Sequence, residues 1–169
     1  AIEAQELGVP ATTIETAVAA RAISAMKPQR TAAAALYAIP RRKLTPRSQA
    51  AFSRQLESAL YAAKISAYAQ GFAVMEQASE TFHWKLPLGT VASIWRNGCI
   101  IRSRFLDLIT KSYARAGNKG NLLLSREFVE IMSDNHRQLR TTVAEAAQAG
   151  LPVPALSAAL AYFDSYRQD

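Results

Sequence analysis

Apolar residues recur along most of the chain at the three- and four-residue spacing that an α-helix requires. The longest such stretch runs from Pro46 to about Glu80 and carries two apolar stripes. These are Phe52, Leu56, Ala59, Ala63 and Ala67, and Tyr61, Ile65, Tyr68, Phe72 and Met75. A helix that is apolar on more than one side is buried on more than one side. The pattern therefore predicts a central helix, roughly 50 Å long, around which the other helices pack.

Proline and glycine mark the ends of the other helices, because Pro suits a first helical turn and Gly the residue after the last. Helices are predicted over 11–27, 28–38, 88–97, 100–116, 125–149 and 155–167, with a turn over 82–87. No segment alternates apolar and polar residues, so no β-sheet is expected. Gly71, inside the central helix, is interpreted as a point of close approach by a neighbouring helix. The predicted fold class is all-α, a multihelical domain built around one long helix.

The length and composition suit one folded domain. The chain has 169 residues, half of them apolar and a fifth charged, which is ordinary for a globular protein. No apolar run approaches the roughly 20 residues that span a bilayer, and the first six residues lack the basic start of a signal peptide. The single cysteine, Cys99, cannot form an internal disulfide. A cytoplasmic protein without a membrane partner is therefore expected.

Metal chemistry and thiol chemistry are both disfavoured. His83 and His136 lie far apart in sequence without metal-ligand spacing, so no metal site is expected. Cys99 stands near Arg96 and Arg102, which could lower the pKa of its thiol. No histidine neighbours it to act as a base, and Ile100 follows it directly. A small buried residue is the favoured interpretation of Cys99.

The chain is strongly basic, with a formal charge of +7 and a pI of about 9.9. Such a charge concentrates anions near the surface, and composition alone leaves nucleic acid, a lipid headgroup and a phosphorylated metabolite open. The densest basic run, Arg41 to Lys43 with Arg47, is short and lacks interleaved aromatic residues. Nucleic-acid binding is therefore not expected. The sequence contains no GxGxxG motif and no P-loop.

Arg21 is the most informative single residue. It shares one helical face with Ile14, Val18 and Ala25, so a guanidinium interrupts an apolar stripe. An arginine buried there would need a counter-charge. From spacing alone, a structural ion pair or an arginine at the edge of the stripe is favoured. The functional alternative is an anion site, since a guanidinium binds phosphate through two hydrogen bonds.

Several blocks of the sequence resemble the 6-phosphogluconate dehydrogenase family. The run Ala59 to Phe72 resembles the family's ALYxxKIxSYAQGF segment, and Trp95 to Leu106 resembles its IxRxGCIIRxxFL motif. Further blocks match in the family's order, at 7–10, 17–21, 121–124, 150–160 and 162–167. The resemblance covers nearly the whole chain. It implies that residues 1–169 form most of the family's helical substrate-binding and dimerisation domain.

The resemblance also implies a function. Enzymes of this family oxidise 6-phosphogluconate with NADP and decarboxylate the intermediate to ribulose 5-phosphate, in the pentose phosphate pathway and in gluconate utilisation. The family's phosphate-binding arginine falls on Arg21, so Arg21 is the candidate substrate-binding residue. No catalytic, cofactor-binding or metal residue is assigned.

The expected partners are 6-phosphogluconate and a second subunit of a homodimer. NADP would bind a Rossmann domain outside this sequence, which also lacks the family's catalytic lysine and glutamate and its C-terminal tail. The piece alone is therefore expected to be inactive. The alternative is a non-catalytic helical scaffold or interaction domain derived from this family.

Overall fold

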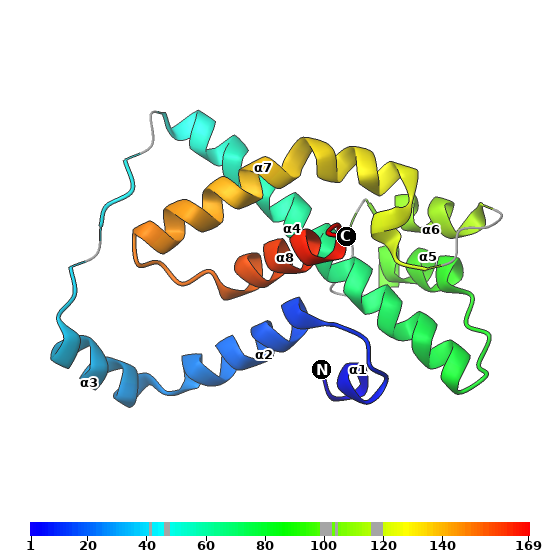
Figure 1. The fold of residues 1–169 in the computed structure, drawn as a ribbon, viewed down its shortest axis with the longest axis horizontal. Helices are drawn as coiled ribbons and strands as arrows, with labels where there is room; N and C mark the ends of the chain where they lie inside the picture. The colour runs from blue at the N-terminus through cyan, green and yellow to red at the C-terminus, as the bar shows by residue number, and fades with distance from the viewer. Residues whose placement is uncertain (41, 46–47, 99–102, 104, 116–119) are drawn as a thin grey trace. The chain divides into compact units, whose positions relative to one another are not determined.

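The fold comes from a computed structural model, which describes every residue except 41, 46–47, 99–102, 104 and 116–119. All of the regular structure that it describes is helical, as the sequence predicts (Figure 1). The α-helices are α1 (Ile2–Glu6), α2 (Thr12–Ala25), α3 (Lys27–Tyr37), α4 (Gln49–Thr81), α5 (Leu88–Gly98), α6 (Leu106–Ala114), α7 (Arg126–Gln148) and α8 (Pro154–Tyr166). A short 3₁₀ turn, η1, covers Leu122–Leu124.

Helix ends lie close to where proline and glycine predict them. Pro28 occupies the first turn of α3, and Pro154 opens α8, where a missing N–H costs nothing. Gly8 and Gly150 each follow a helix with φ of +67°. That left-handed conformation is one that glycine adopts without a steric penalty. The sequence did not predict α1 or η1.

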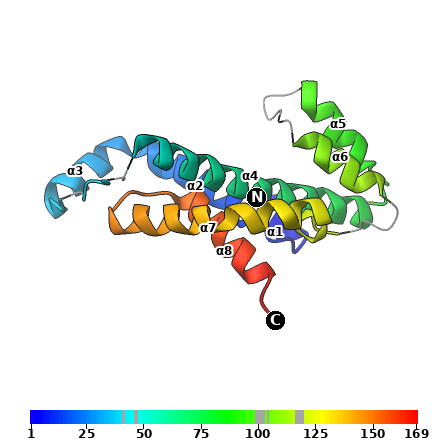
Figure 2. The same cartoon turned by 90° about the horizontal axis from the view of Figure 1, so that it is seen from above.

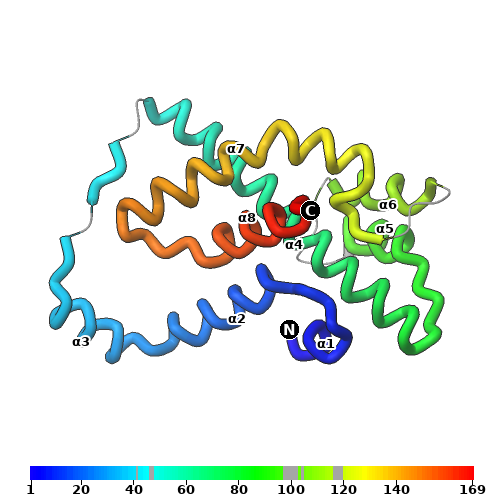
Figure 3. Tube along the Cα trace, viewed as in Figure 1, coloured from blue at the N-terminus to red at the C-terminus, as the bar shows by residue number. Residues whose placement is uncertain are grey.

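The central helix is confirmed as α4, which runs for 33 residues (Figure 3). Its start is capped by Ser48, whose Oγ accepts a hydrogen bond from the backbone N of Ala51 at 3.1 Å. The interpretation of Gly71 is wrong for this chain. A Cβ placed on Gly71 would meet no atom within 4 Å, so no neighbouring helix of the described structure approaches it closely.

The chain divides into two compact units. Unit 1 comprises Ala1–Ala11 and Ala67–Asp134, and unit 2 comprises Thr12–Ser66 and Asn135–Asp169. In unit 1, α5 and α6 pack side by side (Figure 2). Gly89 permits this approach, because a Cβ there would lie 3.4 Å from the Cβ of Tyr113 and 3.5 Å from the carbonyl O of Thr110.

Aromatic rings fill the interior of unit 1. Phe72, fully buried, stacks on Tyr113 at 5.7 Å and meets Trp95 edge-on at 5.5 Å between ring centroids. Phe105 meets Tyr68 and Phe128 edge-on, at 4.6 and 6.5 Å. Such edge-on and offset pairs add to the stabilisation that burial alone provides.

Small residues dominate the interior of unit 2, where α2 packs against α8. Most of the buried apolar side chains there are alanines, with four larger apolar residues among them. They are Ala59, Ala62, Ala63, Ala146, Ala149 and Ala159, together with Ile65, Leu139, Leu160 and Tyr162. Alanines on facing helices let the backbones approach closely.

The helix predicted over 100–116 is shorter than expected. The described helix, α6, begins at Leu106, and Ser103 and Phe105 lie outside it. Residues 100–102, 104 and 116 of the predicted helix lie outside the described residues. Phe105 is the N-cap residue of α6, is only 4% exposed and packs edge-on against Tyr68 and Phe128. Among the described helices, none is both long enough and apolar enough to span a bilayer.

Candidate functional site

Arg21 lies on the exposed side of α2. The apolar stripe that contains it is covered only at its start: Ile14 is half-buried, whereas Val18 is 59% exposed and Ala25 is exposed. The idea that burial forces a counter-charge on Arg21 is therefore wrong for this chain. Within the described ranges Arg21 forms no ion pair.

The corner between α2 and α3 lies five residues after Arg21, at Met26. Met26 joins the two helices, and its backbone N donates to the carbonyl O of Ile23 at 3.1 Å. Arg30 reaches back from α3, and its Nη2 donates to the carbonyl O of Ser24 at 3.2 Å. No residue of α3 is buried. Packing within this chain therefore holds α2 more firmly than α3.

The positive charge of the chain is concentrated in unit 2. By sequence, unit 2 carries twelve Lys and Arg against five Asp and Glu, whereas unit 1 carries eight of each. The 41 residues from Thr16 to Leu56 include eight Lys and Arg and no acidic residue. Arg21 lies within this acid-free stretch. The neighbouring basic residues attract anions, and no acidic residue within this stretch offsets their charge.

A cavity of about 450 Å³ lies in unit 2, at the start of α4. Arg42 and Lys43 line it together with Gln55 and Glu145, and Gln55 donates a hydrogen bond to Glu145 at 2.7 Å. Two members of the basic run thus share the lining of this cavity with a carboxylate. The run's other members, Arg41 and Arg47, lie outside the described residues.

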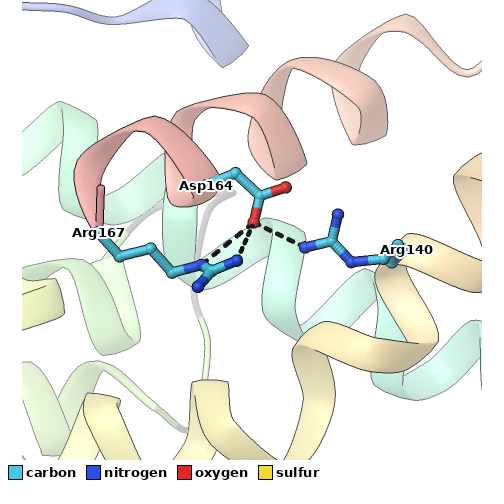
Figure 4. Close-up of polar contacts among 3 residues, drawn as sticks. All are labelled: Arg140, Asp164 and Arg167. Carbon is cyan, nitrogen blue, oxygen red and sulfur yellow. Dashed lines mark hydrogen bonds and ion pairs between the residues drawn. The ribbon is translucent and has the colours of Figure 1, made fainter. Parts of the chain in front are cut away.

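A charged cluster lies at the end of α8 (Figure 4). Oδ1 of Asp164 accepts from Arg140 of α7 at 2.7 Å and from Nε and Nη2 of Arg167 at 3.2 and 3.1 Å. Hydrogen bonding to Arg140 is the main cause that lowers the pKa of Asp164. The three-residue spacing of Asp164 and Arg167 could have indicated their ion pair from the sequence. The ion pair of Asp164 with Arg140 could not be predicted, because it depends on how α7 and α8 pack.

His136 of α7 packs beside this cluster, with its ring 5.6 Å from that of Phe163. Its Nδ1 is buried without a hydrogen-bond partner among the described atoms. Burial lowers the pKa of His136, and the positive charges of Arg140, Arg137 and Arg167 lower it further. The neutral imidazole is therefore the favoured form.

Unit 1 contains a cavity of about 720 Å³ between the end of α4 and the helices α5 and α6. Glu76, Glu80 and Tyr113 line it. The Tyr113 hydroxyl is buried without a partner among the described atoms. Burial, and then the charge of Glu76, raise the pKa of Tyr113 above its usual range. A phenol held neutral in this way can donate a hydrogen bond but does not act as a base.

The cysteine hypothesis concerns residues that the structure does not describe. Cys99 and Arg102 both lie outside the described residues. Arg96 is described, and it pairs with Asp107 of α6 at 3.1 Å. His83 is exposed in the turn after α4, with φ of +57°. Among the described residues, no group of three His, Cys, Asp or Glu side chains has an arrangement that could hold a metal ion.

Comparisons with known proteins agree on one family. A family model described as "6-phosphogluconate dehydrogenase, C-terminal domain" matches residues 1–169. The decarboxylating 6-phosphogluconate dehydrogenase of Shigella flexneri is 45% identical over 97% of the chain and 35% of its own length. That of Salmonella typhimurium is 46% identical, with the same coverage. The chain thus spans about a third of the length of these relatives.

A solved structure of Plasmodium falciparum 6-phosphogluconate dehydrogenase matches the fold with a TM-score of 0.93. It is 38% identical in sequence, and the match covers 99% of the chain and 36% of that protein. Its description names complexes with the cofactor NADP⁺ and with the substrate 6-phosphogluconate.

Proposed function

Because the chain belongs to the family of the 6-phosphogluconate dehydrogenase C-terminal domain, we propose that it forms the phosphate-binding helical part of such an enzyme. The whole protein would be an NADP-dependent decarboxylating 6-phosphogluconate dehydrogenase of the cytoplasm. It would convert 6-phosphogluconate to ribulose 5-phosphate and CO₂. The chain's part in this reaction is to hold the substrate rather than to transfer hydride or protons.

Arg21 carries this proposal. Its guanidinium is exposed on α2, makes no ion pair in the described part of the chain, and lies in a stretch without acidic residues. The guanidinium offers planar, paired donors and a permanent charge, which suit the oxygens of a phosphate monoester. Binding the phosphate, which does not react, would fix the position of the sugar acid. The remote contact would thereby orient the reacting carbons.

The cofactor does not fit this part of the molecule. Dinucleotides bind where a glycine-rich loop joins a β-strand to a helix, and the described residues contain helices and no strand. We therefore assign NADP to the remainder of the protein and derive no step through it. For the same reason we expect this chain alone to form no NADPH from 6-phosphogluconate and NADP.

A second subunit is part of the proposal. The surface of α2 and α3 exposes several large apolar side chains, which a homodimer interface would remove from water. They are Val18, Ile23, Met26, Leu36 and Tyr37. Light scattering on the chain at tens of micromolar should report a dimer, and a clean monomer would count against the dimer.

The test of the substrate role is a pair of substitutions in the full-length enzyme. Arg21→Ala should raise the KM for 6-phosphogluconate about tenfold to a hundredfold, the effect of losing roughly 1.5–3 kcal/mol from a charged hydrogen bond. The KM for NADP should change little. Arg21→Lys should remain impaired, because an ammonium lacks the forked donors. An unchanged KM together with lower thermal stability would instead identify Arg21 as a structural residue.

A further inference from the structure

Near the proposed phosphate site, the side chain of Arg30 hydrogen-bonds to a backbone carbonyl in the last turn of α2. The last carbonyls of a helix have no partner within the helix. At the end of α2, the backbone N of Met26 donates a hydrogen bond to the carbonyl O of Ile23, and Nη2 of Arg30 donates one to the carbonyl O of Ser24 at 3.2 Å. The last turn of α2 itself contains no basic residue. The cation that complements this helix end therefore comes from α3.

The position of this bond relates it to Arg21. Ser24 follows Arg21 by three residues, so the carbonyl that Arg30 holds belongs to the next turn of the same helix face. Within the single chain, the outer face of α2 is exposed beyond Val18 and α3 has no buried residue, so this helix end has no packing of its own before the proposed second subunit covers it. Helix ends without packing fray readily. The Arg30 bond thus opposes fraying of the turn on which the orientation of Arg21 depends.

Charge gives Arg30 a second effect. Between Thr16 and Leu56 the sequence has no carboxylate. In the described part of the chain, Arg21, Lys27 and Arg30 all lack an ion-pair partner. Three cations without ion-pair partners within ten residues of sequence raise the local concentration of a dianion more than one does. Inorganic phosphate and sugar phosphates are ligands of this class.

We propose that Arg30 is a positioning residue of the phosphate site. Its hydrogen bond to Ser24 stabilises the last turn of α2, which follows Arg21, and its charge adds to that of the corner. It does not contact the substrate itself. This inference rests on the proposed role of Arg21. It extends the site from one arginine to the α2–α3 corner, whose positive charge favours ligands with a dianionic group.

The test uses the full-length enzyme with Arg30→Ala, Arg30→Lys and a control, Arg54→Ala. Arg54 is exposed and lies in the same acid-free stretch, but on α4. Arg30→Ala should raise the KM for 6-phosphogluconate and the inhibition constant of inorganic phosphate roughly two- to fivefold. The kcat and the KM for NADP should not change. Arg30→Lys, which keeps the charge and a donor, should restore most of the loss.

Hydrogen exchange supplies the structural readout. The backbone amides of residues 22–26 should exchange faster in Arg30→Ala than in the wild type or in Arg54→Ala. A KM that rises no more in Arg30→Ala than in Arg54→Ala would overturn the inference. If Arg21→Ala also left the KM unchanged, the proposed function itself would fail. An effect of Arg21→Ala without one of Arg30→Ala would refute the positioning role alone.

Discussion

Unit 1 and unit 2 have interiors and charges of different kinds. Unit 1 is neutral by sequence, and its interior is built from interlocking aromatic rings around Phe72 and Phe105. Unit 2 carries the whole excess of positive charge, and most of its buried apolar side chains are alanines. Its helices α2 and α3 leave large apolar and basic side chains exposed.

This difference indicates a division of roles. Large buried rings contribute much apolar area per residue and tolerate change poorly, so unit 1 should determine stability. Uncompensated arginines lower stability through mutual repulsion but attract anionic ligands. Unit 2 should therefore determine ligand affinity, and substitutions in the two units should affect different measurements.

The largest effect on stability is expected from Phe72→Ala in unit 1. Phe72 is fully buried and contacts the rings of Trp95 and Tyr113. Its loss leaves a cavity and should lower the free energy of unfolding by about 3–5 kcal/mol. Urea denaturation would measure this change. Any folded enzyme that remains should keep its KM for 6-phosphogluconate, and a raised KM would contradict the division of roles.

A smaller effect is expected from Asp164→Asn in unit 2. The neutral amide cannot compensate the two guanidiniums that Asp164 holds, so the free energy of unfolding should fall by about 1 kcal/mol. The matched control is Glu130→Gln in unit 1. Glu130 pairs with Arg126, and their side chains are 64% and 84% exposed, respectively. The free energy of unfolding should therefore change by no more than about 0.5 kcal/mol. Equal losses would show that the cluster on α8 is no stronger than a surface pair.

The smallest effect is a pH dependence that arises from His136. Its pKa is lowered in the folded state, so below about pH 6.5 the unfolded chain binds a proton that the folded chain resists. Stability should therefore fall as the pH falls through that range. Arg137, Arg140 and Arg167 face this imidazole, and Asp164 opposes them in part. His136→Gln should flatten the decline between pH 7 and pH 5 in urea titrations, and an unaltered slope would exclude His136 as its source.

Sequence reasoning predicted the helices well because their ends are governed by local chemistry. Pro28, Gly150 and Pro154 lie at helix ends for reasons that need no knowledge of the fold. Tertiary contacts set the remaining features. Phe105, just before α6, packs against Tyr68 and Phe128, and periodicity cannot predict which distant rings it meets.

The candidate site was predicted only in part. Helical spacing placed Arg21 beside Val18 and Ala25, but it could not tell that this stripe remains exposed, because exposure depends on which helices cover it. The substrate role of Arg21 comes from the resemblance and stays a prediction. The bond from Arg30 to Ser24 was not foreseen, although a basic residue shortly after a helix end is a feature that sequence alone can flag.

The most direct test of the central claim compares two ligands that differ by one phosphate. Binding of 6-phosphogluconate and of gluconate to the full-length protein would be measured by calorimetry, for the wild type and for Arg21→Ala. If Arg21 holds the phosphate, the substitution should weaken 6-phosphogluconate binding about tenfold to a hundredfold. It should leave the weaker binding of gluconate nearly unchanged. An equal loss for both ligands, or no loss for either, would contradict the claim.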